Sequence, residues 1–264
     1  MVEDESSFEA AMAARSAADH ADFLMPHLAG DSNVLDVGCG SGEISIGIAS
    51  MVGHVIGVDL EEEEFAAART YAQDHGIANI EFRTGNVYEL DLRDEHFDVA
   101  FCHSMLETVD RPIDGLREIS RTLKRGGVLG VAAVEYGGLI LAGPDEPLLR
   151  RFYAIREQLW LLDGSDPYRG RALRGLLTKA GFERVEATTT FVCYGTAEKV
   201  KSFGLGRAED CLDEWYASGA QANGFATDEE LSAMAQAWRA WSGSSEAYAA
   251  FAWCRAIGWK PGPR

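Results

Sequence analysis

The chain has 264 residues, of which 47% are hydrophobic and 25% are charged, a composition typical of a packed globular protein and not of a disordered one. Asp and Glu number 42 against 24 Lys and Arg, and the resulting net charge of −18 disfavours partners with phosphate backbones or anionic membrane surfaces. A small-molecule substrate is therefore favoured. The length suits one α/β domain with additional helices better than two small domains.

The first half of the chain alternates strands with helices, the pattern of βαβ units and a parallel sheet. One or two helices are predicted over residues 7–28, with Pro26 near their end. Strands are predicted over 33–37, 54–59, 80–84, 97–102 and 128–134, and helices over 42–51, from 61–64 onward and over 112–124. The four acids at 61–64 complement a helix dipole, so we interpret them structurally. Gly126 and Gly127 are expected to turn the chain into the fifth strand.

The alternation stops after Tyr136. A helix and no strand are predicted between 137 and 170, with the helix over 147–162. A helix over 171–180 and a strand over 182–192 follow, and then two helices within 196–242, separated near Gly224. The last element, 248–259, is a candidate strand, although a helix fits almost as well. We expect a single domain over 1–264, with cap helices at 1–30, a cofactor-binding core at 31–136, and helical inserts over the substrate site at 137–170 and 195–243.

The five cysteines are dispersed without C-x-x-C spacing, which argues against a disulfide framework and a zinc site. We predict no metal. The N-terminus is acidic and lacks the basic and apolar regions of a signal peptide, and no apolar run approaches the length of a membrane span. A cytoplasmic location is expected, with no membrane partner.

The glycine-rich stretch after the first strand is the most specific local signal. Asp36 precedes glycines at 38, 40 and 42, a G-x-G-x-G spacing that differs from the G-x-G-x-x-G of dinucleotide-binding proteins. Glycine in such a turn allows positive φ and lets a ligand approach the main chain.

Ligands of open parallel sheets bind beyond the carboxyl ends of the strands, and each predicted strand ends in a plausible ligand group. The second strand ends in Asp59, whose carboxylate can accept hydrogen bonds from both hydroxyls of a ribose. The following strands end in Gly85-Asn86-Val87, Cys102-His103-Ser104 and Glu135-Tyr136.

This ordered set resembles class I S-adenosylmethionine-dependent methyltransferases. Residues 34–42 are similar to motif I, which wraps the methionine portion of the cofactor, and Asp59 resembles the acid that holds the ribose. Gly85-Asn86-Val87 resembles the family's G-D-A or G-D-V motif, with Asn86 replacing the acid that receives the adenine amino group. The Asn86 amide oxygen can still accept that hydrogen bond.

Further segments extend the resemblance. Residues 101–107 resemble the segment that lines the methyl donor, 123–127 are close to the L-K-P-G-G turn with Arg125 in place of Pro, and 179–182 resemble the A-G-F entry into the sixth strand. Residues 15–17 and 24–28 look like the UbiE-type, methyltransferase type 11 small-molecule branch. In that branch an N-terminal helix covers the cofactor, which implies Arg15 as a partner for the methionine carboxylate.

The resemblance implies a Rossmann-like doubly wound, mostly parallel seven-stranded sheet with helical cap inserts. It implies S-adenosyl-L-methionine as cofactor and S-adenosyl-L-homocysteine as product. The cofactor-binding residues expected from the motifs and strand ends are Arg15, Asp36, Gly38, Cys39, Gly40, Gly42, Asp59, Leu60, Gly85, Asn86, Val87, Cys102 and His103.

Methyl transfer from an activated sulfonium needs in-line positioning of a nucleophile and, for some acceptors, proton removal. The catalytic candidates are His103, Glu135 and Tyr136, with His20 and His27 as more remote possibilities. His103 can instead form part of the cofactor wall. Aromatic residues of the inserts favour an apolar or aromatic acceptor, if they face the site and do not simply fill a core.

Three functions remain open at this point: a small-molecule methyltransferase acting on oxygen, nitrogen or carbon, a non-methylating cofactor-binding protein or pericyclase of the same fold, and an NAD-dependent oxidoreductase. The glycine spacing and the A-G-F segment disfavour the last. A homodimer is possible.

Overall fold

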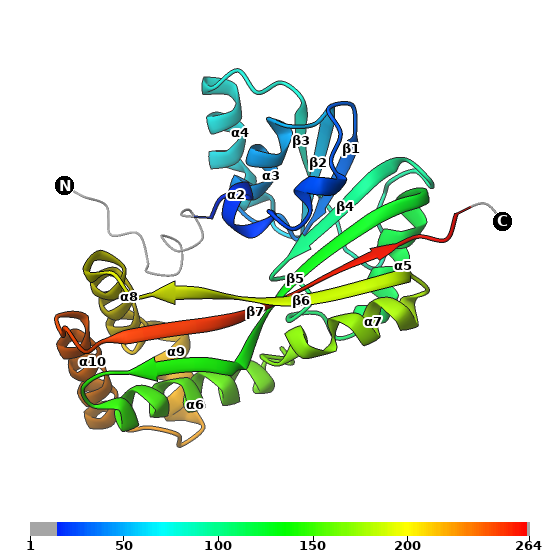
Figure 1. Cartoon of the computed structure of the whole chain (residues 1–264). Helices are drawn as coiled ribbons and strands as arrows, with labels where there is room; N and C mark the ends of the chain where they lie inside the picture. Colours follow the sequence, from blue (N-terminus) through cyan, green and yellow to red (C-terminus); the bar gives the residue numbers. More distant parts are fainter. Residues whose placement is uncertain (1–14, 263–264) are drawn as a thin grey trace. The chain divides into compact units, whose positions relative to one another are not determined.

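The strands of the first half form because short apolar runs are closed by glycine or polar turns. A computed structural model describes residues 15–262 (Figure 1). It places β1 at Asn33–Val37, β2 at His54–Asp59, β3 at Ile80–Thr84, β4 at Phe97–His103, β5 at Leu123–Ala142, β6 at Glu183–Tyr194 and β7 at Tyr248–Trp259. The first three have the predicted bounds, and β7 is a strand.

The seven strands form one sheet in the order β3-β2-β1-β4-β5-β7-β6. β1 pairs in parallel with β2 and β4, β2 with β3, and β4 with β5. The predicted fold class, a Rossmann-like, mostly parallel seven-stranded sheet, is confirmed.

The helices that the structure describes fall close to their predicted positions, whereas the part of the first helical prediction over 7–14 lies outside the described residues. In the first half they are α2 (Ala17–His20), the 3₁₀ turn η1 (Met25–His27), α3 (Glu43–Ala49), η2 (Glu62–Glu64), α4 (Phe65–Asp74) and α5 (Pro112–Thr122). In the second half they are α6 (Glu146–Leu162), η3 (Arg169–Ala172), α7 (Leu173–Ala180), α8 (Ala197–Asp210), α9 (Glu214–Ala222) and α10 (Asp228–Ser242). Of the four acids predicted to begin a helix, Glu62–Glu64 form η2 directly before α4, and Glu61 precedes η2.

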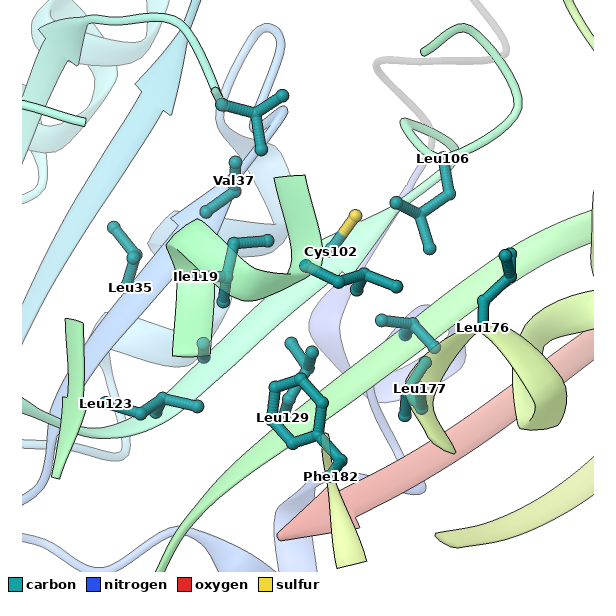
Figure 2. Close-up of a cluster of buried hydrophobic side chains, with 14 of the residues drawn as sticks. Leu35, Val37, Cys102, Leu106, Ile119, Leu123, Leu129, Leu176, Leu177 and Phe182 are labelled. Atoms are coloured by element: carbon teal, nitrogen blue, oxygen red, sulfur yellow. The ribbon is translucent and has the colours of Figure 1, made fainter. Parts of the chain in front are cut away.

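Strand β1 is buried on both faces, which is why its sequence is almost continuously apolar. Leu35 and Val37 pack into a cluster with side chains of α5 and α7 (Figure 2). Val34 packs on the opposite side, with Ile44 and Ile48 of α3. Helices therefore cover both faces of the sheet at β1.

The chain divides into two compact units. The sheet unit comprises, within the described chain, residues 15–134, 169–189 and 254–262, and contains the two clusters around β1. Over the same described residues, the helical unit comprises Glu135–Tyr168 and Thr190–Trp253. It contains α6, α8, α9 and α10 and has its own core, in which Phe152, Tyr216, Trp238 and Trp241 are fully buried.

Strand β5 is longer than predicted, and the expectation that residues 137–170 contain no strand is wrong. The strand runs on to Ala142, and Leu139 and Leu141 join the core of the helical unit. Gly137 and Gly138 suggest a break in the sequence, but a Cβ atom on Gly138 would collide with Ala252 of β7. Glycine here permits close approach of two strands.

The expected turn at Gly126-Gly127 is likewise part of β5. Gly126 has φ +79°, but its N–H donates to Lys260 O at 3.0 Å, and Lys260 N–H donates to Gly127 O at 2.9 Å. Because Gly126 and Gly127 pair through their backbones with Lys260, the residue after β7, the strand continues across the two glycines.

The stretch predicted as two helices contains three. The separation near Gly224 is confirmed, but a second break lies between α8 and α9. The Asp213 side chain accepts a hydrogen bond from Tyr216 N–H and caps α9. An aspartate is a good N-cap, so this start was marked in the sequence.

Candidate functional site

The turn after β1 requires its glycines. Gly38, Gly40 and Gly42 have φ of +75°, +50° and +83°. A Cβ atom on Gly38 would lie 2.6 Å from the Met105 side chain, and one on Gly42 would lie 2.7 Å from the Phe82 ring. The turn combines a left-handed backbone with close packing, and this keeps its outer surface free of side chains at the glycines.

Asp59 at the end of β2 is bonded to this turn. Its Oδ2 accepts a hydrogen bond from Gly40 N–H at 2.7 Å, and its Oδ1 accepts one from Leu60 N–H at 2.7 Å. Each carboxylate oxygen has a further lone pair, so the group can still accept two hydroxyl hydrogen bonds. The Leu60 side chain is 64% exposed, an apolar surface directly beside the acid. This arrangement fits a nucleoside.

Asp36 and Cys39 support the turn from inside. The buried Asp36 carboxyl accepts a hydrogen bond from Ser45 Oγ at 2.5 Å, which links β1 to α3. Burial raises the pKa of Asp36 to about 7, and the charge of Asp59 adds to this rise. Burial also raises the pKa of the Cys39 thiol, which therefore stays protonated.

The segment after β3 is joined to Asp59 through its backbone. Gly85 N–H donates to Asp59 O at 2.8 Å. The Asn86 side-chain oxygen accepts from Tyr88 N–H at 3.0 Å and keeps one lone pair for another donor. Val87 packs in the core and fixes the segment, so Asn86 is held at the sheet edge that carries Asp59.

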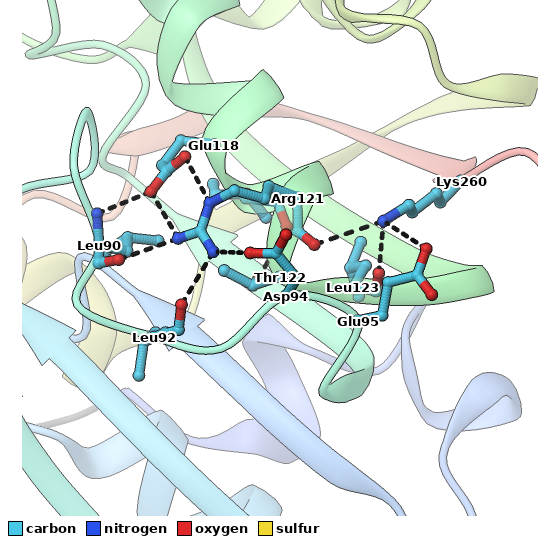
Figure 3. A network of polar contacts seen from close by, with 10 residues as sticks. Leu90, Leu92, Asp94, Glu95, Glu118, Arg121, Thr122, Leu123 and Lys260 are labelled. Carbon is cyan, nitrogen blue, oxygen red and sulfur yellow. Dashed lines mark hydrogen bonds and ion pairs between the residues drawn. The ribbon is translucent and has the colours of Figure 1, made fainter.

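Arg121, on the last turn of α5, anchors the chain that follows this segment (Figure 3). Its guanidinium donates to Leu92 O at 2.8 Å, to Leu90 O at 2.9 Å and to Glu118 at 2.7 Å, and it also pairs with Asp94. Glu118 in turn accepts from Leu90 N–H at 2.8 Å. Because the guanidinium group has several donors in a fixed plane, one arginine side chain can bind several backbone carbonyls of the same loop.

The end of β4 brings His103 and Cys102 into the interior. The Cys102 thiol is fully buried, and burial raises its pKa well above the ordinary value. Burial lowers the pKa of His103 well below its ordinary value, and the charges of Arg15, His20 and Arg255 act in the same direction. Its imidazole is therefore neutral near pH 7. The His20 ring lies edge-on to it at 5.2 Å, whereas His27 contacts Trp259.

Glu107 is a buried acid that the motif comparison did not single out as a site residue. Its Oε1 accepts a hydrogen bond from Val134 N–H at 2.8 Å, and its Oε2 has no partner within residues 15–262. Burial raises its pKa to about 7, opposed by the charges of Arg15 and Arg169. Arg15 thus lies within electrostatic reach of both Glu107 and His103. The only sign of Glu107 in the sequence is that an acidic residue stands in a largely apolar stretch, between Leu106 and Val109.

Glu135 and Tyr136 belong to the helical unit, whereas His103 belongs to the sheet unit. Glu135 is buried, and its Oε1 accepts from Gly137 N–H at 2.9 Å. The Tyr136 hydroxyl accepts from Arg156 Nε at 3.3 Å, and its ring lies 5.3 Å from that of Trp160. Arg156 was not anticipated, because its partner is 20 residues away on another element.

Two classes of feature are missing from the described chain. Residues 15–262 contain no group of three or more His, Cys, Asp or Glu side chains arranged to hold a metal ion. Over the same residues, no helix has the length and apolar character needed to cross a membrane.

Comparison with known proteins gives consistent matches. A family model described as a methyltransferase domain matches residues 28–150. A demethylmenaquinone methyltransferase of Listeria monocytogenes is 28% identical over 194 residues, covering 67% of this chain and 79% of that protein. The structure of the YcgJ protein of Bacillus subtilis superposes with a TM-score of 0.62 at 15% identity over 92% of this chain and 97% of that one. The [4+2]-cyclase SpnF superposes with a TM-score of 0.55 at 21% identity, over 92% of this chain and 80% of that one.

Proposed function

Because this chain is a class I S-adenosylmethionine-dependent methyltransferase, we propose that it methylates a small apolar or aromatic acceptor and that its helical unit selects that acceptor. The observation that carries the proposal is the aromatic surrounding of Tyr136. Its ring lies 5.3 Å from Trp160, 6.2 Å from Tyr153 and 6.5 Å from Phe251. Aromatic walls with a few polar groups are typical of sites for small organic ligands.

The cofactor roles are assigned to residues of the sheet unit. Asp59 would accept the ribose hydroxyls, the exposed Leu60 would cover the adenine, and Asn86 would accept its amino group. The turn of Gly38, Gly40 and Gly42 would receive the methionine portion, and Arg15 its carboxylate. The remaining residues support this surface: Asp36, Cys39, Gly85, Val87, Cys102 and His103.

Bound S-adenosylmethionine supplies a methyl group already activated on a sulfonium. The protein then has to orient the acceptor and, where its nucleophile carries a proton, remove that proton. A neutral His103 with a strongly lowered pKa is a weak base, so we assign it to the cofactor wall. Glu135 and Tyr136 are the candidates for positioning the acceptor and taking its proton.

The charge of the chain supports a small acceptor over a nucleic acid, since −18 opposes binding to a polyphosphate. A homodimer stays a prediction. A pericyclase or other non-methylating use of the cofactor is the competing function, because fold and cofactor site do not fix the reaction.

Calorimetric titration with S-adenosylhomocysteine tests the cofactor assignment. We expect wild type to bind it and to leave NAD unbound. Asp59→Asn and Asp59→Ala should weaken binding by at least about tenfold, since each removes charge-assisted acceptors. Asp74→Ala, an exposed acid at the end of α4, is the matched control. Equal affinity of the Asp59 variants and wild type would overturn the ribose assignment.

Product mass tests the reaction. Incubation with S-adenosylmethionine and a panel of small aromatic acceptors should give a product heavier by one methyl group replacing a hydrogen. Turnover of an acceptor to an isomer of unchanged mass would support the pericyclase instead.

A further inference from the structure

Two arginines of the helical unit converge on one buried aspartate. Arg156 of α6 places Nη1 3.5 Å from Asp210 Oδ2, and Arg207 of α8 places its Nη1 2.9 Å from the same atom. The three side chains are 11%, 15% and 5% exposed. We call Arg156, Arg207 and Asp210 the guanidinium cluster. Counted over these three side chains of the described chain, the cluster carries two positive charges and one negative charge largely away from water, and a buried charge is costly unless something compensates it.

Hydrogen-bond donors beside this cluster are unsatisfied. Within the described residues, the buried atoms Arg207 Nε, Tyr153 Oη and Trp238 Nε1 have no hydrogen-bond partner. Most buried polar groups in native proteins have a partner, which can be a ligand or ordered water. All three atoms can donate a hydrogen bond, and two of them cannot accept one, so the missing partner is an acceptor.

These donors belong to one contiguous set of rings. The Tyr153 ring lies 6.0 Å from that of Trp238, and the Trp238 ring lies 5.8 Å from that of Phe203. The Arg207 guanidinium lies 5.4 Å from the centre of the Phe203 ring. The surplus positive charge and the unsatisfied donors therefore share one aromatic environment.

The set continues to Tyr136. Arg156 Nε donates to the Tyr136 hydroxyl at 3.3 Å, and the guanidinium of Arg156 lies 5.5 Å from the centre of the Trp215 ring. Arg156 thus joins the guanidinium cluster to a residue already assigned to the acceptor. A planar apolar molecule with an acidic group would match both parts of this environment.

We propose that the guanidinium cluster, with Tyr153 beside it, binds a carboxylate on the methyl acceptor, so that the acceptor is a small aromatic acid. The assignment of this ligand as the acceptor rests on the proposed function. Guanidinium groups bind carboxylates with directional, charge-assisted hydrogen bonds, and the phenol of Tyr153 supplies a further donor.

A matched ligand pair tests the charge requirement. Cinnamate and cinnamamide have the same aromatic ring and side chain, but cinnamamide carries a neutral amide in place of the carboxylate. Titration calorimetry on the full chain, with and without S-adenosylhomocysteine, should show cinnamate binding at least about tenfold tighter than cinnamamide. Equal affinities, or no binding of either, would overturn the proposal.

Variants locate the site. Arg207→Met should remove most of the preference for cinnamate, while Arg151→Met, which loses an exposed bond to Phe225 O, should retain it. Tyr153→Phe should weaken cinnamate binding severalfold without lowering stability, because the lost hydroxyl has no protein partner among the described residues. Tyr216→Phe is the opposite control: it loses a 3.0 Å hydrogen bond to Phe152 O, so its stability should fall while binding persists. Cinnamate binding that is unchanged in both Arg207→Met and Tyr153→Phe would refute the location.

The two proposals fail separately. If S-adenosylhomocysteine binds and cinnamate does not, the acidic-acceptor inference is wrong and the methyltransferase function stands. If cinnamate binds through Arg207 but no methylated acid forms from any aromatic acid tested, the anion site stands and its assignment to the acceptor is wrong.

Discussion

Replacing Glu107 by Gln should change how the stability of the protein depends on pH. The Glu107 carboxyl has a pKa of about 7 in the folded protein against an ordinary value of 4.5, because it is buried. Between these two values the folded protein holds a proton that the unfolded chain releases, so the free energy of unfolding falls as pH rises. At 1.36 kcal/mol for each pH unit of separation, the total loss is about 3 kcal/mol.

The Gln variant keeps an oxygen that can accept from Val134 N–H, and it cannot ionise. Its free energy of unfolding relative to wild type should therefore rise by about 3 kcal/mol between about pH 4.5 and about pH 8. Urea unfolding followed by circular dichroism at several pH values measures this difference. If the amide group itself destabilises the fold, it lowers the free energy of unfolding of the variant by the same amount at every pH. The change of the difference with pH is therefore unaffected.

The control is Glu118→Gln. The pKa of Glu118 is lowered, chiefly by its hydrogen bond with Arg121, so this carboxylate is ionised in both states above about pH 5. The Glu118 variant should be destabilised by a nearly constant amount over the same range. If the difference between the Glu107 variant and wild type is also constant with pH, the burial argument for Glu107 is refuted.

Three further predictions concern the turn, the loop anchor and a helix cap. Gly38→Ala should lower the free energy of unfolding by about 1–3 kcal/mol more than Gly76→Ala, because both glycines have positive φ but only Gly38 would push a Cβ atom into Met105; equal losses would show that Met105 yields. Arg121→Met should cost about 2–4 kcal/mol by thermal or urea unfolding, while Lys124→Met, which loses a single, partly exposed ion pair with Asp98, should cost less than about 1 kcal/mol. Similar costs would contradict the role given to the Arg121 guanidinium. Thr227→Ala should cost about 1 kcal/mol by removing the capping box of α10, and a neutral result would mean that packing alone fixes this helix start.

The parts of the fold that depend on local sequence could be predicted. The strands β1 and β2 are short, mostly apolar runs, and β3 alternates apolar with polar residues. The predicted bounds of all three agree with the structure. The end of β5 could not be predicted, because Gly137 and Gly138 usually interrupt a strand. Only the close approach of Ala252, more than a hundred residues away, shows why glycine stands there.

The site divides in the same way. The turn glycines and Asp59 follow from spacing, since a strand end and a left-handed turn are properties of a few consecutive residues. The contacts of Glu107 with Val134 and of Arg156 with Asp210 join residues 27 and 54 positions apart. Such pairs depend on how the elements pack, and no pattern in the sequence specifies them.

The aromatic core of the helical unit also determines what the intrinsic fluorescence of this protein reports. Five of the six tryptophans, at positions 160, 215, 238, 241 and 253, belong to the helical unit, and only Trp259 belongs to the sheet unit. Ultraviolet emission will therefore follow the helical unit almost alone, whereas circular dichroism follows both units. Unfolding curves that coincide by the two signals would show that the units unfold together, and curves that separate would resolve the stability of each.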